Sequence, residues 1–167
     1  EEHRRRDPRP LFLSVQTLFP HGPYDVARVP PGEVPAFTFS QDAEINEYMH
    51  RVVSSRIEFH RFLSGLKERP GARGTVVLEY GDHQSVATRP HLEQAGELSL
   101  SDMHSPAYRT FLSVHAFGAE LDARVFDEPM DAGFLSAALV EAAGLPSSPL
   151  LRGLSRLRKA CGGRYHD

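Results

Sequence analysis

A short apolar run that ends in Gly-Asp-His constrains this chain more than any other stretch of its sequence. Residues 75–79 (TVVLE) are mostly β-branched and aliphatic, and Tyr80 and Gly81 follow them directly. An apolar run of this length, bounded by glycine, predicts a strand that is largely buried in a sheet. Gly81 is expected to allow a sharp turn at the end of that strand, because glycine adopts backbone angles that other residues avoid.

Two residue types that bind metal ions stand immediately after this predicted strand. Asp82 and His83 are adjacent, and in an α/β sheet the segment beyond the carboxyl end of a strand is where ligands bind. A carboxylate oxygen and an imidazole nitrogen together suit a borderline divalent metal ion. The pair fits equally well in an ordinary surface turn, with Asp82 as the turn former and His83 exposed to solvent. Adjacency alone leaves both interpretations open.

The composition is that of an ordinary globular domain. The chain has 167 residues, of which 40% are hydrophobic and 25% are charged, enough to bury a sizeable core. The net charge of -3 predicts no general attraction to nucleic acid or to an anionic membrane. Cys161 is the single cysteine, so neither a disulfide nor a multi-cysteine zinc site can form within the chain. We expect no membrane span, and the charged first residues are unlike a signal peptide.

A second apolar run, residues 11–19 (LFLSVQTLF), has the composition of an interior strand. Residues 1–10 before it are charged and contain prolines, and are interpreted as a linker or frayed end ahead of one domain, residues 11–167. The run stops at the sequence PHGPYD, where two prolines and a glycine force a turn. His21 and Tyr24 therefore follow one predicted strand end, as the Asp-His pair follows the other.

A long helix is predicted between the two runs. Ser40 or Asp42 begins it, and apolar residues then recur at spacings of three, four or seven positions along one face. These residues are Ile45, Met49, Val52, Phe59, Leu63 and Leu66. Strand, helix and strand form a βαβ unit with a right-handed crossover if the strands are parallel. A further strand is predicted at residues 108–117, a helix capped by Asp131 follows it, and another helix begins at Ser148. The prediction is therefore an α/β fold with a mixed, mainly parallel sheet flanked by helices.

The remaining histidines give weaker signals. His50 and His60 fall on the predicted long helix, where packed or solvated side chains are the more frequent outcome. His91 and His104 fall in the polar stretch after the Asp-His pair and could reach a site from a loop, although their spacing does not require it. Motifs of phosphate-loop NTPases, dinucleotide enzymes, zincin proteases and α/β-hydrolases are absent. No sequence motif therefore supports a Ser-His-Asp hydrolase.

If the two predicted strands lie in one sheet and point the same way, the turns after them meet at one crevice. His21 would then donate a hydrogen bond to an anionic oxygen while Asp82 and His83 bind a metal ion, an arrangement suited to metal-assisted phosphoryl or sulfuryl transfer. A proline-rich surface turn is the alternative for His21 and Tyr24. Two protein ligands are too few for such a metal site, and no activated nucleophile is evident, so the predicted site is incomplete.

The order of these motifs resembles a known family. PHGPY after an apolar run, a long helix and then VVLEYGDHQ are similar to the C-terminal half of the sulfatase-like members of the alkaline phosphatase superfamily. The nearest branch comprises bacterial membrane-anchored sulfatases, phosphoethanolamine transferases and lipoteichoic-acid-synthase-like enzymes. The shared pattern is a histidine followed by x-Pro-Tyr or x-Pro-Phe, then a strand followed by Gly-Asp-His. It covers residues 11–167 except the loop at 26–39, and Gln84 stands where the family often has glycine.

The resemblance implies an alkaline-phosphatase-like α/β/α sandwich in a metal-dependent hydrolase or transferase that acts on phosphate or sulfate esters. It makes Asp82 and His83 ligands of a divalent metal ion (Zn, Mn, Ca or Mg), and it makes His21, with Tyr24, a contact of the ester. In the family, an N-terminal half supplies another acidic ligand and the nucleophile. This chain matches neither. Cys161 is not assigned as the nucleophile because it lacks the C-x-P-x-R context of a sulfatase nucleophile. The chain is therefore expected to be part of a larger, extracytoplasmic enzyme and inactive alone. The alternative hypothesis is a non-catalytic α/β domain that keeps the fold and binds an anion or a partner protein.

Overall fold

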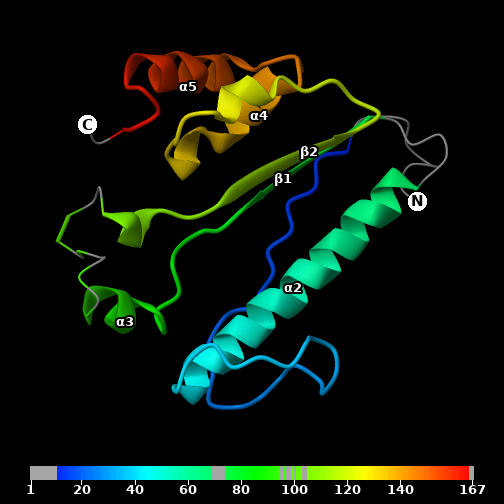
Figure 1. The fold of residues 1–167 in the computed structure, drawn as a ribbon. Coiled ribbons are helices and arrows are strands. Elements are labelled where there is room, and N and C mark those ends of the chain that lie inside the picture. The colour runs from blue at the N-terminus through cyan, green and yellow to red at the C-terminus, as the bar shows by residue number, and fades with distance from the viewer. Residues whose placement is uncertain are drawn as a thin grey trace. The chain divides into compact units, whose positions relative to one another are not determined.

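The structure of the protein, a computed structural model, describes residues 11–68, 74–94, 96, 99, 101–102 and 105–165. The predicted linker at residues 1–10 and the candidate His104 lie outside the described residues. The chain divides into two compact units, Glu1–Ile57 and Glu58–Asp167. Helices and a small sheet are both present (Figure 1), so the mixed α/β class predicted from the sequence is confirmed at this level.

Helix α2, Ala43–Lys67, is the predicted long helix, and the boundary between the two units falls within it. Asp42 begins the helix, because its Oδ1 atom accepts hydrogen bonds from the backbone N–H groups of Glu44 (2.8 Å) and Ile45 (3.3 Å). A carboxylate at this position accepts hydrogen bonds from amide groups that have no partner within the helix, and its negative charge is attracted to the positive N-terminal end of the helix. Ser40, the other candidate for this role, accepts the N–H of Asp42 through its hydroxyl.

The sheet consists of strands β1, Thr75–Tyr80, and β2, Leu112–Phe117. They pair in antiparallel order, with Thr75 opposite Phe117 and Tyr80 opposite Leu112. The strand predicted at 75–79 is thus confirmed, and the strand predicted within 108–117 begins later than its apolar pattern suggests. Tyr108 instead ends a 3-10 turn, Pro106–Tyr108, in which Ser105 caps the N–H of Ala107, and residues 109–111 have no regular secondary structure.

The predicted strand at residues 11–19 is wrong, because these residues have no regular secondary structure. A strand needs a neighbouring strand to pair its backbone N–H and C=O groups, and in the described part of the chain β1 and β2 pair only with each other. The apolar side chains of the segment consequently remain in solvent, with Phe12 83% and Val15 72% exposed. The described residues therefore contain no βαβ unit and no parallel sheet.

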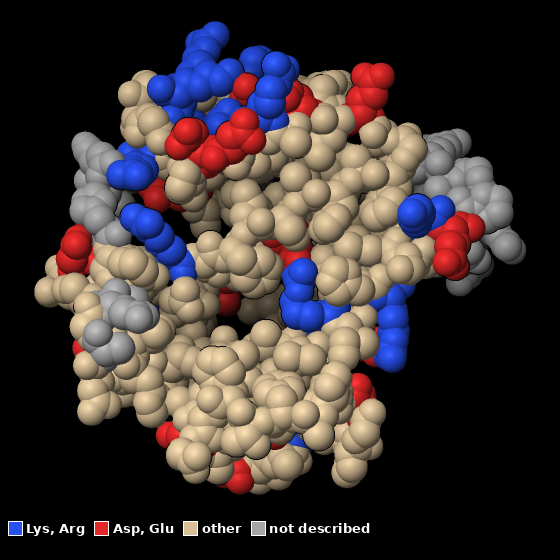
Figure 2. Space-filling model, in the orientation of Figure 1, with Lys and Arg blue, Asp and Glu red and all other residues tan. Residues whose placement is uncertain are grey.

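The C-terminal part of the second unit is a pair of packed helices, α4 (Leu135–Ala142) and α5 (Pro149–Ala160). A 3-10 turn at Ala132–Phe134 leads into α4, whose inward face is fully buried. The buried residues here are Phe134, Leu135, Ala137, Ala138 and Ala142. Ser148 begins α5 as predicted, since its hydroxyl accepts the N–H of Leu151 at 3.3 Å. Lysine and arginine side chains gather over α5 (Figure 2).

Asp131 does not cap the helix that follows it, which corrects the sequence prediction. Its side chain makes no capping hydrogen bond, and its Oδ2 atom instead accepts the backbone N–H of Tyr165 at 2.6 Å. The carboxylate of Asp131 therefore connects Tyr165, the last described residue, to the residues that lead into α4. Two further short elements complete the described fold, α3 at Arg89–Gln94 and a 3-10 turn at Ala123–Phe126. Among the described residues, no helix combines the length and the apolar character that crossing a membrane requires.

Candidate functional site

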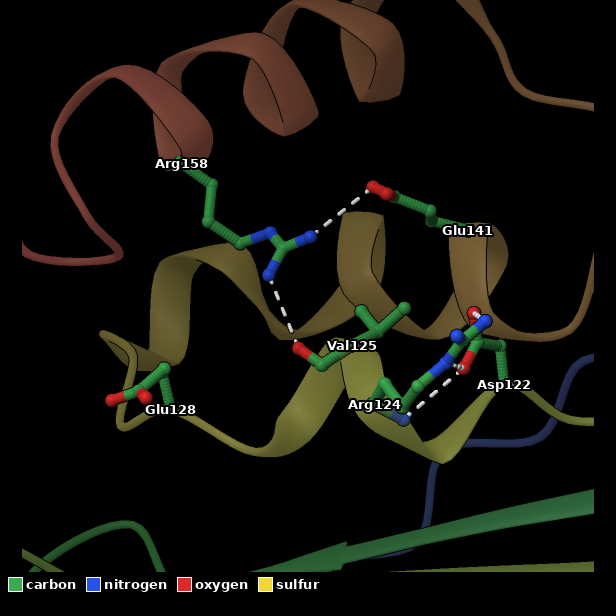
Figure 3. A pocket seen from close by; sticks show the side chains of 6 residues that line it. All are labelled: Asp122, Arg124, Val125, Glu128, Glu141 and Arg158. Atoms are coloured by element: carbon green, nitrogen blue, oxygen red, sulfur yellow. Dashed lines mark hydrogen bonds and ion pairs between the residues drawn. The ribbon is translucent and has the colours of Figure 1, made fainter.

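A charged pocket of about 410 Å³ lies within the second unit (Figure 3). Its lining residues are Asp122, Arg124, Val125, Glu128, Glu141 and Arg158. Arg158 donates to the carbonyl oxygen of Val125 (3.1 Å) and to Glu141 Oε2 (3.2 Å), and Arg124 donates to both carboxylate oxygens of Asp122 at 2.8 and 2.9 Å. Arg158 therefore links α5 to α4 and to the segment around Val125.

Glu141 is the carboxylate that Arg158 contacts in this pocket. Its carboxylate accepts hydrogen bonds from Lys159 (2.7 Å), from the hydroxyl of Ser155 and from Arg158. The hydrogen bond from Lys159, with those from Ser155 and Arg158, lowers the pKa of Glu141 to about 2. The shift is large because every one of these partners stabilises the ionised form. The sequence analysis did not identify this group.

The turn after β1 depends on the close packing of Gly81. Its N–H donates to the carbonyl oxygen of Phe111 at 3.1 Å, and a Cβ atom at this position would lie 2.0 Å from Thr110 Oγ1. Gly81 is not among the glycines with positive φ. Glycine is therefore required here because a side chain would clash with Thr110, and not because the backbone is left-handed.

Asp82 and His83 form the tip of this turn. Asp82 Oδ1 accepts the backbone N–H of His83 at 3.0 Å, and Asp82 Oδ2 lies 3.7 Å from His83 Nε2. The two side chains are 68% and 51% exposed. His83 Nδ1 lies 2.8 Å from the carbonyl oxygen of Gln84, and because a carbonyl only accepts, Nδ1 carries the proton. Nε2 of neutral His83 therefore presents a lone pair to solvent beside a carboxylate.

Gln84 makes two contacts that stabilise this turn. Its backbone carbonyl holds the ring of His83, and its side-chain Nε2 donates to the carbonyl oxygen of Arg109 at 2.5 Å. Glycine, which the resembling family often has here, could make the first contact but not the second. The residue that departs from the family pattern thus fixes the loop to the segment before β2. Sequence reasoning missed this supporting role, which has no short-range signal.

His21 shows the same ring arrangement in the first unit. Its Nδ1 lies 2.9 Å from the carbonyl oxygen of Gly22, so Nδ1 is the donor and Nε2 carries the lone pair in the neutral ring. The side chain is exposed. The Tyr24 hydroxyl donates to the carbonyl oxygen of Pro20 at 2.9 Å and closes the turn from inside. The peptide bond between Gly22 and Pro23 is cis.

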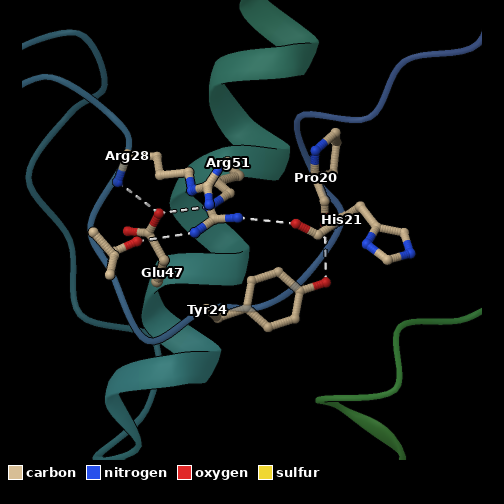
Figure 4. Close-up of polar contacts among 7 residues, drawn as sticks. Pro20, His21, Tyr24, Arg28, Glu47 and Arg51 are labelled. Atoms are coloured by element: carbon tan, nitrogen blue, oxygen red, sulfur yellow. Dashed lines mark hydrogen bonds and ion pairs between the residues drawn. The ribbon is translucent and has the colours of Figure 1, made fainter.

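Arg51 of α2 holds this turn (Figure 4). The side chain is 1% exposed and donates to Glu47 Oε1 (2.6 Å), to the carbonyl oxygen of His21 (2.9 Å) and to that of Val26 (2.9 Å). Its guanidinium also lies over the ring of Tyr24, 5.2 Å from the centroid, a favourable cation–π distance. Sequence reasoning missed this group, although glutamate and arginine at i and i+4 on a helix are a recognisable pair.

This ion pair is buried, with Arg51 1% and Glu47 8% exposed. Glu47 Oε1 also accepts the backbone N–H of Arg28 at 2.9 Å, so the carboxylate connects the following loop to the same helix. Tyr48 meets Tyr24 edge-on, with 5.5 Å between ring centroids. Burial, with a smaller contribution from Tyr24, raises the pKa of Tyr48. Charged groups removed from water need such a complete set of partners.

The two predicted halves of the site lie in different units. His21 and Tyr24 belong to Glu1–Ile57, whereas Asp82 and His83 belong to Glu58–Asp167, so their convergence stays a prediction. Within the described residues no group of three or more His, Cys, Asp or Glu side chains could hold a metal ion.

The other histidines that the sequence analysis weighed have the following positions. The ring of His50 bonds the carbonyl oxygen of Phe37 at 3.1 Å and packs edge-on against its ring, so it has a structural partner. His60 is exposed on α2, and His91 lies in the short helix α3. Neither belongs to a cluster of metal-ligating residues within the described part of the chain.

Comparisons with protein-family models, with curated proteins and with solved structures found no match to this chain. Functional inference therefore depends on the geometry of the two histidine turns. Both present an exposed imidazole whose Nδ1 is fixed by the next residue's carbonyl, and one of them adds a carboxylate.

Proposed function

We propose that this chain is part of a metal-dependent, sulfatase-like hydrolase or transferase of the alkaline phosphatase superfamily, acting on phosphate or sulfate esters. Asp82 and His83 are its contribution to the metal site, and His21 contacts the anionic group of the ester. The observation that carries the proposal is the turn after β1, where a lone-pair nitrogen and a carboxylate oxygen lie 3.7 Å apart and open to solvent.

The donor set of this turn fits a divalent metal ion. Histidines that bind metals usually donate their other ring N–H to a backbone carbonyl or carboxylate, which fixes the tautomer and the ring orientation. His83 has such a partner in the carbonyl oxygen of Gln84, and Asp82 supplies the hard oxygen ligand beside it. When bound, the ion supplies Lewis-acid stabilisation of the charge on the ester group.

His21 serves the ester as a hydrogen-bond donor only in its protonated form, because Nδ1–H already donates to the carbonyl oxygen of Gly22. An imidazolium is the form that an anionic phosphate or sulfate oxygen favours. Tyr24 stabilises the turn that carries His21. Its hydroxyl is engaged by Pro20 and its ring lies under Arg51, so we assign it the role of shaping the turn rather than binding the ester directly.

The rest of the active site is proposed to come from another part of the same protein. The resemblance places the nucleophile and a further acidic ligand in an N-terminal half, and this chain has no counterpart of either. The apolar residues 11–19, which are exposed and have no regular secondary structure here, would be covered by the rest of the protein, in which we propose the mainly parallel α/β/α sheet. An extracytoplasmic location, with the complete protein anchored in a membrane, belongs to the same proposal.

The second candidate is a non-catalytic α/β domain that binds an anion or a partner protein. This candidate predicts no metal-dependent turnover and no loss of structure on chelation.

Ester turnover by the protein that contains this chain separates the two candidates. We expect Mn²⁺- or Zn²⁺-dependent hydrolysis of a chromogenic phosphate or sulfate ester. Because each of these side chains is proposed to coordinate the metal ion, Asp82→Asn and His83→Gln should each weaken metal binding and lower kcat at least about 100-fold. Asp127→Asn, at another exposed aspartate, is the matched control and should leave kcat unchanged. Turnover that survives both site variants rules out the metal role, and a complete lack of turnover favours the binding domain.

A further inference from the structure

The exposed face of α5 contains only two kinds of side chain. Arg152, Arg156 and Lys159 recur at spacings of four and three along one line of the helix, which we call the basic stripe. Beside it runs an apolar stripe of Leu150, Gly153, Leu157 and Ala160, at spacings of three, four and three. All of these residues are exposed, with Leu150 72% and Leu157 40% accessible.

The opposite face of α5 accounts for its stability, so the exposed stripes are not needed for folding. Leu151 and Leu154 are partly buried, and α5 packs along α4. Arg158 reaches inward to Val125 and Glu141. An amphipathic helix buries one apolar face against its own domain, and α5 does so with these residues while it leaves two leucines outside.

The segment that contains α5 is cationic although the chain as a whole is acidic, and acidic side chains lie beside its cations (Figure 2). Residues 142–165 contain five arginine or lysine residues and no aspartate or glutamate, whereas the net charge of the chain is -3. Glu141 pairs with Lys159 and compensates part of that charge. The side chain of Arg156 makes no hydrogen bond or ion pair with the described residues. The resulting gathering of cations is visible over α5 in Figure 2.

We propose that this face of α5 lies on an anionic lipid membrane. A polyanion such as nucleic acid would use the basic stripe, but it would leave Leu150 and Leu157 in water. Lipid headgroups and the acyl boundary below them accommodate both stripes at once, because interfacial helices combine lysine or arginine with leucine. The exposed face has no neutral polar residue and no acidic residue, which also favours a membrane over a polar protein surface.

Flotation of the full chain with lipid vesicles tests the proposal. We expect binding to phosphatidylcholine vesicles that contain about one third phosphatidylserine, little binding to pure phosphatidylcholine, and weakening by salt. Each basic residue at an anionic surface contributes on the order of 1 kcal/mol, so Arg152→Gln with Arg156→Gln should weaken the vesicle partition coefficient about 30-fold. Leu150→Ser should weaken it several-fold.

Matched controls make the result decisive. Arg61→Gln with Lys67→Gln removes two positive charges, as many as the α5 double variant, from exposed positions of α2. This variant should bind the vesicles as the parent chain does. Circular dichroism confirms that each variant is folded. Equal loss in both double variants, or no binding to anionic vesicles, overturns the proposal. Tighter binding to a single-stranded oligonucleotide than to vesicles, insensitive to Leu150→Ser, also overturns it and assigns the basic stripe to a polyanion.

Discussion

Arg51 donates a hydrogen bond from Nη1 to the carbonyl oxygen of His21 over 2.9 Å, across 30 positions of sequence. The same guanidinium is paired with Glu47 and is 1% exposed. A buried cation thus fixes the backbone of the residue whose ring faces solvent. Because the contact is made to a carbonyl, it determines the shape of the turn and leaves the His21 side chain available.

Replacing Arg51 is expected to destabilise the first unit strongly. Arg51→Met leaves the Glu47 carboxylate buried without its cation and removes donors from the carbonyls of His21 and Val26, which should lower the free energy of unfolding by about 3 to 5 kcal/mol. Urea unfolding followed by circular dichroism measures the loss. Arg61→Met, at an exposed position of the same helix, should change the stability by less than about 0.5 kcal/mol.

A second variant separates the cost of the buried charge from that of the lost hydrogen bonds. Glu47→Leu combined with Arg51→Met should be less destabilising than Arg51→Met alone, since no unpaired charge then remains inside. If the double variant is as unstable as the sum of both single variants, the ion pair is not the coupled unit that its geometry indicates.

The packing of Gly81 against Thr110 predicts a coupled pair of substitutions. Gly81→Ala places a methyl group 2.0 Å from Thr110 Oγ1 and should cost about 1 to 3 kcal/mol of unfolding free energy, as overpacking does. In a Thr110→Ala background the same change should cost at least about 1 kcal/mol less, because the clashing oxygen is gone. Additive effects across this double-mutant cycle would show that the contact does not limit the turn.

The lowered pKa of Glu141, about 2, makes part of the stability dependent on pH. A carboxyl whose pKa is depressed in the folded state stabilises the protein above its unfolded value of 4.5, and this contribution is lost as the pH falls from there towards 2. Since the side chain is 30% exposed, we expect about 1 to 2 kcal/mol at neutral pH.

Unfolding of Glu141→Gln measures this contribution. The variant should be less stable than the parent chain at pH 7, and the difference should shrink as the pH is lowered through 4 and 3. Glu120→Gln, at an exposed glutamate, is the control and should show no such convergence. A stability difference between Glu141→Gln and the parent chain that stays constant down to pH 2 contradicts the assignment.

Both site histidines should be the Nδ1–H tautomer when neutral. His21 and His83 each donate Nδ1–H to the carbonyl oxygen of the following residue, which leaves Nε2 unprotonated. Long-range ¹⁵N–¹H correlation spectra distinguish the two ring nitrogens directly. Finding the proton on Nε2 of His83 would remove the lone pair on which the metal proposal depends.

Local signals in the sequence predicted the elements that depend on local chemistry. The start of α2 at Asp42, the start of α5 at Ser148 and the strand after residue 74 follow from capping and periodicity, and the structure confirms them. These features need only neighbours a few residues away. The sequence therefore sufficed for them.

Features that depend on distant partners were not predictable in the same way. An apolar run such as residues 11–19 predicts a strand only if another strand is present to pair with it, and the described residues supply none. Arg51 and Gln84 act through carbonyl oxygens 30 and 25 positions away, and nothing in their own neighbourhoods indicates those contacts. His21, Asp82 and His83 lie in turns that directly follow apolar runs, as expected from the sequence, and their role in a site stays a prediction.

Paramagnetic Mn²⁺ titration of the chain, followed by NMR of its histidine rings, tests whether Asp82 and His83 bind a metal ion. Because Mn²⁺ broadens the signals of nuclei close to it, we predict selective broadening of the His83 ring at low Mn²⁺ concentrations, with His60 and His115 unaffected. Asp82→Asn should abolish that broadening, while Asp127→Asn preserves it. Uniform broadening of all exposed histidines, or broadening of His83 that persists in Asp82→Asn, would contradict a metal site at Asp82 and His83.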